Sequence, residues 1–247
     1  MNNIRNRRTI RKYSAQPIDD ALLHTLLEDA MRTQTMGNLQ LYSVVVTRDA
    51  EMKRRLAPMH FNQPMVEQSQ VVLTFCADFH RTTTWCEQRK ASPGYDNLLS
   101  LFNAMSDCLL YCQTFCNLAE EKGLGLCYLG TTIYNAQSII DLLQLPKLTL
   151  PVATITVGWP DERPNLTERL PLRGIIHQEH YHDYAAADID NIYDAKEQCE
   201  ENKHFVEINN KKTLAQVFTD CRYKKEDNES ISQILLDTLY HQGFMSK

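Results

Sequence analysis

Arg5-Asn-Arg7-Arg8-Thr9-Ile10-Arg11-Lys12-Tyr13 is the stretch around which this chain of 247 residues is organised. Five of its residues are basic, whereas the first acidic residue of the chain is Asp19. The remaining sequence holds 21 basic and 31 acidic residues, so its net charge is −10, against −5 for the whole chain. One positive segment on an otherwise acidic chain predicts an anionic ligand near the N-terminus.

A phosphate monoester fits this segment well. It carries about −1.5 to −2 charges at neutral pH, and a planar guanidinium binds two of its oxygens at once. The alternative is a solvated arm that frays at the N-terminus. Two features favour an ordered segment: Ile10 and Tyr13 are interleaved with the cations, and Pro17-Ile-Asp-Asp20 leads directly into an expected helix.

The composition indicates a globular protein of the cytoplasm. Apolar residues make up 43% of the chain, which is enough for a sizeable core. The sequence contains no run of about 20 apolar residues of the kind that spans a membrane. The basic N-terminus is followed by a charged amphipathic helix and not by the apolar stretch of a secretory signal. We therefore expect a cytoplasmic protein without a membrane segment.

Neither the cysteines nor the histidines form a metal-binding pattern. Cys108, Cys112 and Cys116 recur every four residues inside a helical pattern, which predicts a buried stripe of small apolar side chains. The chain contains no C-x-x-C pair. The histidines of residues 177–182 lie outside any helical pattern, so we expect an extended interface arm there and not a metal site. We expect His60 on the surface or in a loop, without a catalytic partner.

Hydrophobic periodicity predicts a mixture of helices and strands. Val44-Val45-Val46 indicates a buried strand, and Gly123 ends the longest helix. The segment 81–96 has no clean period, so we expect a mobile excursion there, in the manner of a lid. The expected helices are 19–33, 49–56, 98–122, 135–143, 188–203 and 230–242, and the expected strands are 39–47, 71–77 and 150–158.

The helix expected over 98–122 is apolar on nearly every face. Leu98, Leu101 and Met105 step along one side, and Leu99 and Leu110 add apolar residues elsewhere. One thin domain could not bury all of these side chains. Two interpretations remain, a helix wholly inside a large monomer or a helix in a dimer interface, and we prefer the second.

Gly123-Leu-Gly125-Leu-Cys-Tyr128-Leu-Gly130-Thr131-Thr132 is a second distinctive motif. Its glycines differ in spacing from the G-x-G-x-x-G loop of dinucleotide-binding domains. That loop also follows a strand, whereas this motif follows a helix. We therefore exclude a Rossmann domain.

Four motifs together resemble those of the nitroreductase family, and most closely those of its NADPH-linked flavin reductases and oxygen-insensitive nitroreductases. They occur in family order at family spacing, and they are Arg7–Tyr13, Gly123–Thr131, Leu150–Pro160 and Pro164–Pro171. The resemblance implies an α+β fold with a mainly antiparallel sheet flanked by helices, an intertwined homodimer, and flavin mononucleotide (FMN) at the subunit boundary. We expect the FMN-binding core and its interface arm within 1–182, and a C-terminal helical extension of the same domain over 183–247.

The resemblance also implies which residues hold FMN. Thr35 lies in a turn that family members often supply from the partner subunit, and a plain connecting loop is the alternative here. Thr167 stands where the family has a Lys, so one cation for the phosphate is missing. The residues expected at the phosphate and ribityl chain are Arg7, Arg8, Thr9, Arg11, Thr35, Thr167 and Arg169, and those at the flavin ring are Gln63, Tyr128, Leu129, Gly130 and Thr131.

The implied function is an FMN-dependent oxidoreductase that transfers a hydride from NAD(P)H through flavin N5 to a nitro, quinone or flavin acceptor in a ping-pong cycle. Because the flavin performs the chemistry, we name no catalytic side chain. Lys211 and Lys212 stand where the flavin-reductase branch has basic residues for the 2′-phosphate of NADPH, so we expect NADPH to be preferred over NADH. The alternatives are a flavin-binding protein without turnover and a nucleic-acid-binding module that uses the basic arm. The net charge of −5 opposes the second.

Overall fold

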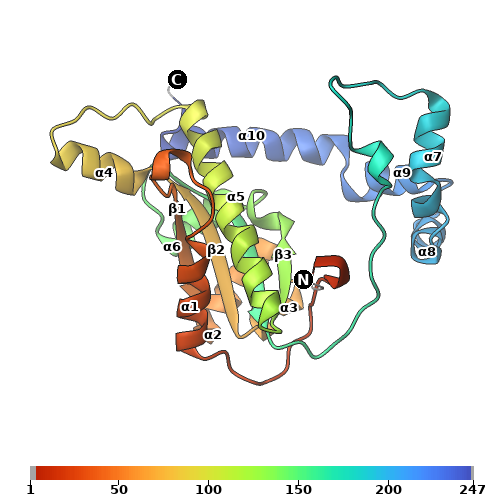
Figure 1. Cartoon of the computed structure of the whole chain (residues 1–247), viewed down its shortest axis with the longest axis horizontal. Coiled ribbons are helices and arrows are strands. Elements are labelled where there is room, and N and C mark those ends of the chain that lie inside the picture. The colour runs from red at the N-terminus through yellow and green to blue at the C-terminus, as the bar shows by residue number, and fades with distance from the viewer. Residues whose placement is uncertain (1–3, 246–247) are drawn as a thin grey trace. The chain divides into compact units, whose positions relative to one another are not determined.

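The computed structural model describes residues 4–245 and divides the chain into two compact units. The first unit comprises Met1–Asn165 and Gln233–Lys247, and the second comprises Leu166–Ser232. The chain thus leaves the first unit after its sheet is complete and returns to it with the end of its last helix (Figure 1). The functional division expected after residue 182 stays a prediction.

A four-stranded antiparallel sheet forms the centre of the first unit. Its strand order is β1-β2-β4-β3, so β2 and β4 are central and the other two strands lie at the edges. The strands are β1 (Tyr42–Thr47), β2 (Val71–Asp78), β3 (Gly125–Leu129) and β4 (Thr149–Gly158). The predicted α+β fold with an antiparallel sheet is confirmed.

Helix α5 (Leu98–Glu121) packs across one face of the sheet, with α1 (Asp20–Ala30) beside it (Figure 1). Leu73 and Phe75 of β2 are fully buried on this face, because alternate residues of a strand point to the same side. The expected cysteine stripe lies buried in this layer as free thiols, namely Cys108, Cys112 and Cys116.

The opposite face of the sheet is covered by three short helices, α2 (Ala50–Leu56), α3 (Pro64–Gln68) and α6 (Ala136–Leu143). Val72 and Cys127 point to this side and join a second, smaller apolar cluster. This layer carries the segments that lead into the candidate site described below.

The end of α10 (Lys225–Gln242) closes the first unit. The side-chain amide of Gln242 donates hydrogen bonds of 3.0 and 2.6 Å to the carbonyl oxygens of Pro146 and Thr149. Phe244 is fully buried in the main core. The last residues of the described chain are therefore part of the sheet unit.

The described part of the second unit consists of helices and connecting segments. Its helices are η5 (Leu172–Gly174), α7 (Ala186–Glu197), α8 (Glu200–Ile208), α9 (Leu214–Val217) and the first turns of α10, with a π-helical turn at Phe218–Arg222. His177 stacks on Tyr181 at 4.1 Å between ring centroids. Across residues 4–245, no group of three or more His, Cys, Asp and Glu side chains is placed to hold a metal ion.

The structure corrects three local expectations. The Val44-Val45-Val46 strand is an edge strand, and Val46 is 43% exposed, so its predicted burial is wrong. The 81–96 excursion contains helix α4 (His80–Gln88), whose consecutive threonines have low helix propensity and conceal it in the sequence. The single helix expected over 188–203 is two helices, because residues Gln198 and Cys199 separate α7 from α8.

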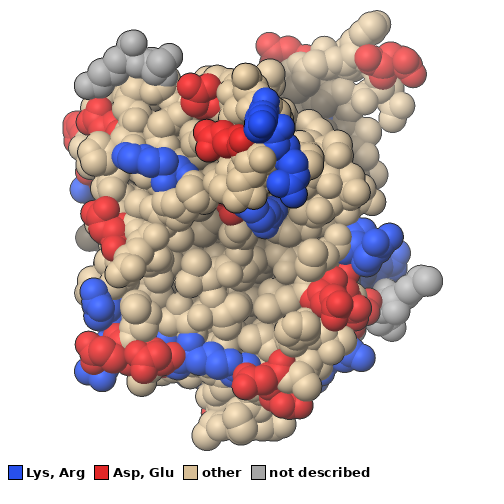
Figure 2. Space-filling view, turned by 90° about the vertical axis from the view of Figure 1, so that its left-hand side faces the viewer, with Lys and Arg blue, Asp and Glu red and all other residues tan. Residues whose placement is uncertain are grey.

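Helix α5 exposes large apolar side chains, since Leu99 and Phe102 are 71% and 58% exposed. The interpretation that this helix lies wholly inside a monomer is therefore wrong. Figure 2 shows one face of the chain with a broad central area that is free of Lys, Arg, Asp and Glu. Within residues 4–245, every helix falls short of the length and apolarity that crossing a bilayer requires.

Candidate functional site

The basic N-terminal segment runs beside the sheet and is hydrogen-bonded to it. The amide of Ile10 donates to the carbonyl of Leu126 in β3 at 2.9 Å, and the amide of Ser14 donates to the carbonyl of Trp159 at 2.9 Å. Tyr13 forms an isolated antiparallel bridge with Pro160. The alternative of a frayed arm is therefore wrong from Ile10 onward.

Two contacts fix this segment closely. The Tyr13 hydroxyl lies 2.7 Å from the Thr156 hydroxyl and donates to the carbonyl of Ile10 at 2.8 Å, and burial raises the pKa of Tyr13. A Cβ on Gly125 would lie 2.7 Å from the Cβ of Ile10, so a glycine is required where the segment crosses β3.

The carboxylate of Glu162 holds the backbone of the cationic residues. It accepts hydrogen bonds from the amides of Arg11 and of Lys12, the latter at 3.0 Å, while both basic residues are exposed. Burial raises the pKa of the Cys127 thiol, and the charges of Arg11 and Arg7 oppose that rise, so Arg11 lies near the middle of β3. The segment therefore presents a cation from a rigid backbone.

Arg7 and Arg8 lie at the start of the same segment, and each has a partner. The Arg7 Nε is 3.5 Å from the Glu120 carboxylate, and the Arg8 Nε donates to the carbonyl of Pro164 at 2.7 Å. A cavity of about 510 Å³ lies between them, Arg163 and the end of α5. Thr9, between Arg8 and Ile10, is partly buried.

The turn after β3 is open to solvent on one side. Tyr128 is 46% exposed and Leu129 is buried. Gly130 is exposed, and a Cβ placed on it would meet no atom within 4 Å. The turn η4 (Gly130–Thr132) therefore offers bare backbone with free space beside it, as a flat ligand requires.

His60 closes the buried side of this turn, and its expected surface position is wrong. It is fully buried, and its Nδ1 lies 2.8 Å from the Thr131 hydroxyl. Burial lowers the pKa of His60 to about 4, so the ring is neutral near pH 7. Its Nε2 is buried without a hydrogen-bond partner among the described residues.

Gln63 belongs to the same turn as His60. Its amide donates to the His60 carbonyl at 3.2 Å, and its side chain is partly buried. Phe61 and Asn62 between them have positive φ angles of 57° and 52°. The structure thus brings the segments of Gln63 and Thr131 together through His60.

Thr35 lies in a different turn, which α5 holds in place. Asp107 is buried, and its two carboxylate oxygens accept from the amides of Met36 at 2.8 Å and Leu41 at 3.2 Å. The described hydrogen bonds join Thr35 neither to the N-terminal segment nor to the Gly130 turn. The choice between a flavin-contacting turn and a connecting loop stays open.

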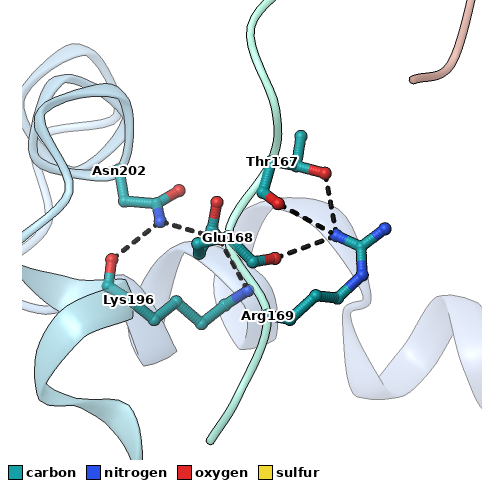
Figure 3. A network of polar contacts seen from close by, with 5 residues as sticks. All are labelled: Thr167, Glu168, Arg169, Lys196 and Asn202. Carbon is teal, nitrogen blue, oxygen red and sulfur yellow. Dashed lines mark hydrogen bonds and ion pairs between the residues drawn. The ribbon is translucent and has the colours of Figure 1, made fainter. Parts of the chain in front are cut away.

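Thr167 and Arg169 lie in the second unit, in a turn that Glu168 anchors (Figure 3). The Glu168 carboxylate binds Lys196 at 3.0 Å and Asn202 at 3.2 Å, and these hydrogen bonds lower its pKa. Arg169 lies on the other side of the turn, where it donates to the Thr167 hydroxyl at 2.8 Å and to nearby carbonyls. Its guanidinium is exposed and contacts only polar groups of its own turn among the described residues.

Lys211 and Lys212 differ in their surroundings. The Lys211 ammonium lies 2.9 Å from the Asp220 carboxylate, and this hydrogen bond raises the pKa of Lys211. Lys212 is exposed and lines a cavity of about 390 Å³ together with Lys203 and Glu207. Of the pair, Lys212 is the one whose charge is not engaged by a carboxylate within the described chain.

Solved structures share this fold over nearly the whole chain. A candidate oxidoreductase from Bacteroides fragilis has a TM-score of 0.98, covers 100% of both chains and is 59% identical. The nitroreductase NfrA1 from Bacillus subtilis has a TM-score of 0.86 and 26% identity, over 98% of this chain and 97% of its own. The class is thus that of the α+β nitroreductase-like proteins.

Sequence comparison gives the family itself. The profile described as Nitroreductase family matches residues 4–159, and the chain belongs to this family. The Oxygen-insensitive NADPH nitroreductase of Salmonella typhimurium is 31% identical over 70% of this chain and 71% of its own length. The FMN reductase (NADPH) of Bacillus subtilis is 31% identical over 73% and 75%. The family and branch identified from the motifs are confirmed.

Three residues of the candidate site escape the sequence analysis. Asp107 is an acid in the middle of an apolar helix, a signal that could have marked it as a buried acceptor. Glu162 offers no such signal, because its partners lie 150 and 151 residues earlier in the chain. His60 was noticed but placed on the surface.

Proposed function

We propose that this chain is an FMN-dependent oxidoreductase that passes a hydride from NADPH, by way of bound FMN, to a nitro, quinone or flavin acceptor in a ping-pong cycle. The observation that carries the proposal is the ordered cationic segment along β3, the strand that ends in the open Gly130 turn. When bound, FMN supplies reversible two-electron transfer at N5. The side chains of this protein bind it, orient it and limit its contact with water.

The N-terminal segment fits the phosphate of FMN. Arg11 has a fixed backbone and an exposed guanidinium, so it can bind phosphate oxygens with little loss of conformational entropy. Arg7 and Arg8 supply further positive charge, and Thr9 supplies a hydroxyl. Because both arginines have partners in the chain, we assign Arg11 the largest share of phosphate binding. The assignment of Thr167 and Arg169 rests on the family motif.

The Gly130 turn fits the flat ring. The absence of a side chain at Gly130 leaves its backbone open to close approach. Tyr128, Leu129 and Thr131 flank it, and Gln63 belongs to the neighbouring turn. An orphaned buried nitrogen on His60 lies behind this arrangement, which is typical of a site whose polar groups serve a function as well as stability.

The proposed hydride donor is NADPH. Relatives named as NADPH-dependent enzymes support this choice. Lys212 presents an exposed ammonium at the rim of a cavity, where it can attract a 2′-phosphate, and Lys211 assists it less because Asp220 neutralises its charge.

We also propose a homodimer, with Thr35 completing the partner's site. The exposed Leu99 and Phe102 of α5 support it, because the cores of protein interfaces are apolar and poor in charge. The uncharged area in Figure 2 is suited to the same purpose. The cytoplasmic location expected from the composition stays a prediction.

Initial-rate kinetics tests the reaction type. Varying NADPH at several fixed concentrations of a quinone should give parallel double-reciprocal lines, because the reduced enzyme forms before the acceptor binds. Intersecting lines would contradict the ping-pong cycle. Absence of NADPH oxidation with any flat acceptor would favour a flavin-binding protein without turnover.

A further inference from the structure

We infer that His60 is a positioning residue of the flavin site: its Nδ1–H donates to the Thr131 hydroxyl, so that the hydroxyl proton of Thr131 is free to donate to an acceptor atom of the ligand at the Gly130 turn. The inference rests on the proposed function, because it assigns a hydrogen-bond donor to the site proposed for the flavin ring.

The geometry places His60 where it can act on this turn alone. Its side chain is fully buried, and Nδ1 lies 2.8 Å from the Thr131 Oγ1. Among residues 4–245, this ring is the one hydrogen-bond partner given for the Thr131 hydroxyl. A second tie joins the same two segments, since the Asn135 amide donates to the carbonyl of Met59 at 2.7 Å.

The tautomer follows from the cost of unpaired groups. Neutral imidazole carries one N–H, on either Nδ1 or Nε2. With the proton on Nε2, a buried N–H would lack a partner, because Nε2 contacts no acceptor in the described chain. With the proton on Nδ1, the unpaired group is a lone pair, and buried acceptors without partners are tolerated more often than buried donors. We therefore place the proton on Nδ1.

This tautomer decides what Thr131 can do. A hydroxyl carries one proton and two lone pairs, so when it accepts from His60 its own proton must point elsewhere. Thr131 is partly buried beside the exposed Gly130. The site thus gains a donor for a carbonyl oxygen or a ring nitrogen. The low pKa of His60, about 4, keeps this arrangement unchanged through the neutral range.

The test measures FMN dissociation constants by fluorescence quenching for wild type and matched pairs of variants. His60→Leu and Thr131→Val should each weaken FMN binding about three- to tenfold, the effect of one neutral hydrogen bond. His60→Asn retains a donor near the Nδ1 position and Thr131→Ser retains the hydroxyl, so both should bind within about twofold of wild type.

The double variant His60→Leu/Thr131→Val separates positioning from stability. Replacing both partners by apolar groups leaves no unpaired polar atom at this contact and is close to neutral for folding. If His60 acts through the Thr131 hydroxyl, the double variant recovers its melting temperature but still binds FMN as weakly as Thr131→Val. Recovery of wild-type FMN affinity in the double variant would overturn the inference.

A measurement without ligand keeps the inference separate from the proposed function. Nitrogen-15 NMR of the FMN-free protein reports which ring nitrogen of His60 is protonated. The Nδ1–H form at pH 7 supports the inference, and the Nε2–H form overturns it, whether or not wild type binds FMN. A wild type that binds no FMN would defeat the proposed function instead.

Discussion

The guanidinium of Arg7 lies 3.5 Å from the carboxylate of Glu120, at the point where the N-terminal segment meets the end of α5. Both side chains are largely shielded from solvent, with 28% and 12% exposed. Burial raises the pKa of Glu120, and the charge of Arg7 only partly opposes this rise. The pair therefore holds an acid that is costly to ionise next to a cation proposed for phosphate binding.

This pair predicts a pH-dependent effect of Glu120→Gln. A carboxyl whose folded pKa lies above its unfolded value of 4.5 costs stability once the pH rises past 4.5, and the cost is complete above the folded pKa. Gln does not ionise, so the stability of Glu120→Gln relative to wild type should increase from pH 4 to pH 7. Urea denaturation at both pH values measures it, and a relative stability that falls with pH would contradict this account.

A second prediction concerns Arg11. Replacing it by Ala should weaken FMN binding by about 1.5–3 kcal/mol, as expected for the loss of a charge-assisted hydrogen bond. The matched control is Lys12→Ala, which removes the same charge from the next residue and should cost at most about 1 kcal/mol, as for a screened surface charge. Arg169→Ala tests the family motif in the same assay. Equal affinities for Arg11→Ala and Lys12→Ala would remove Arg11 from the phosphate site.

A third prediction is a homodimer that depends on α5. Light scattering at micromolar concentration should give twice the chain mass of 28.6 kDa. Phe102→Glu places a charge at an exposed apolar position and should produce monomers, because burying an unpaired charge costs several kcal/mol. Thr25→Glu on the exposed side of α1 is the control and should stay dimeric. A monomeric wild type would refute the assembly.

A fourth prediction separates Lys211 from Lys212. Because Asp220 already pairs with Lys211, Lys212→Ala should lower the NADPH over NADH preference in kcat/KM more than Lys211→Ala does. A single ammonium without bidentate geometry should contribute about 1 kcal/mol, or roughly fivefold. Steady-state kinetics with both cofactors decides this, and a preference that survives loss of both lysines would place the 2′-phosphate elsewhere.

Much of the fold can be predicted from local patterns. The apolar steps from Leu98 and the stop at Gly123 locate α5, and the run from Val71 to Ala77 locates β2, because these signals depend on residues close in sequence. Val46 shows the limit of such reasoning. A run of valines does not reveal whether its strand lies at the centre of a sheet or at the edge.

The candidate site was predictable in part, for the same reason. The cations and the glycine turn are visible as motifs, whereas the contacts that order them are not. His60 meets Thr131 across 71 residues and Glu162 meets Arg11 across 151, so neither contact leaves a periodic trace. The assignment of individual residues to FMN stays a prediction until binding is measured.

The absorbance spectrum of the purified protein under anaerobic conditions tests the central claim most directly. Protein reconstituted with FMN should keep a flavin spectrum after gel filtration, and one equivalent of NADPH per bound flavin should bleach it fully, because each NADPH delivers two electrons. Air or a quinone should restore the colour. A protein that loses its flavin on the column, or whose bound flavin stays yellow in excess NADPH, would contradict the account.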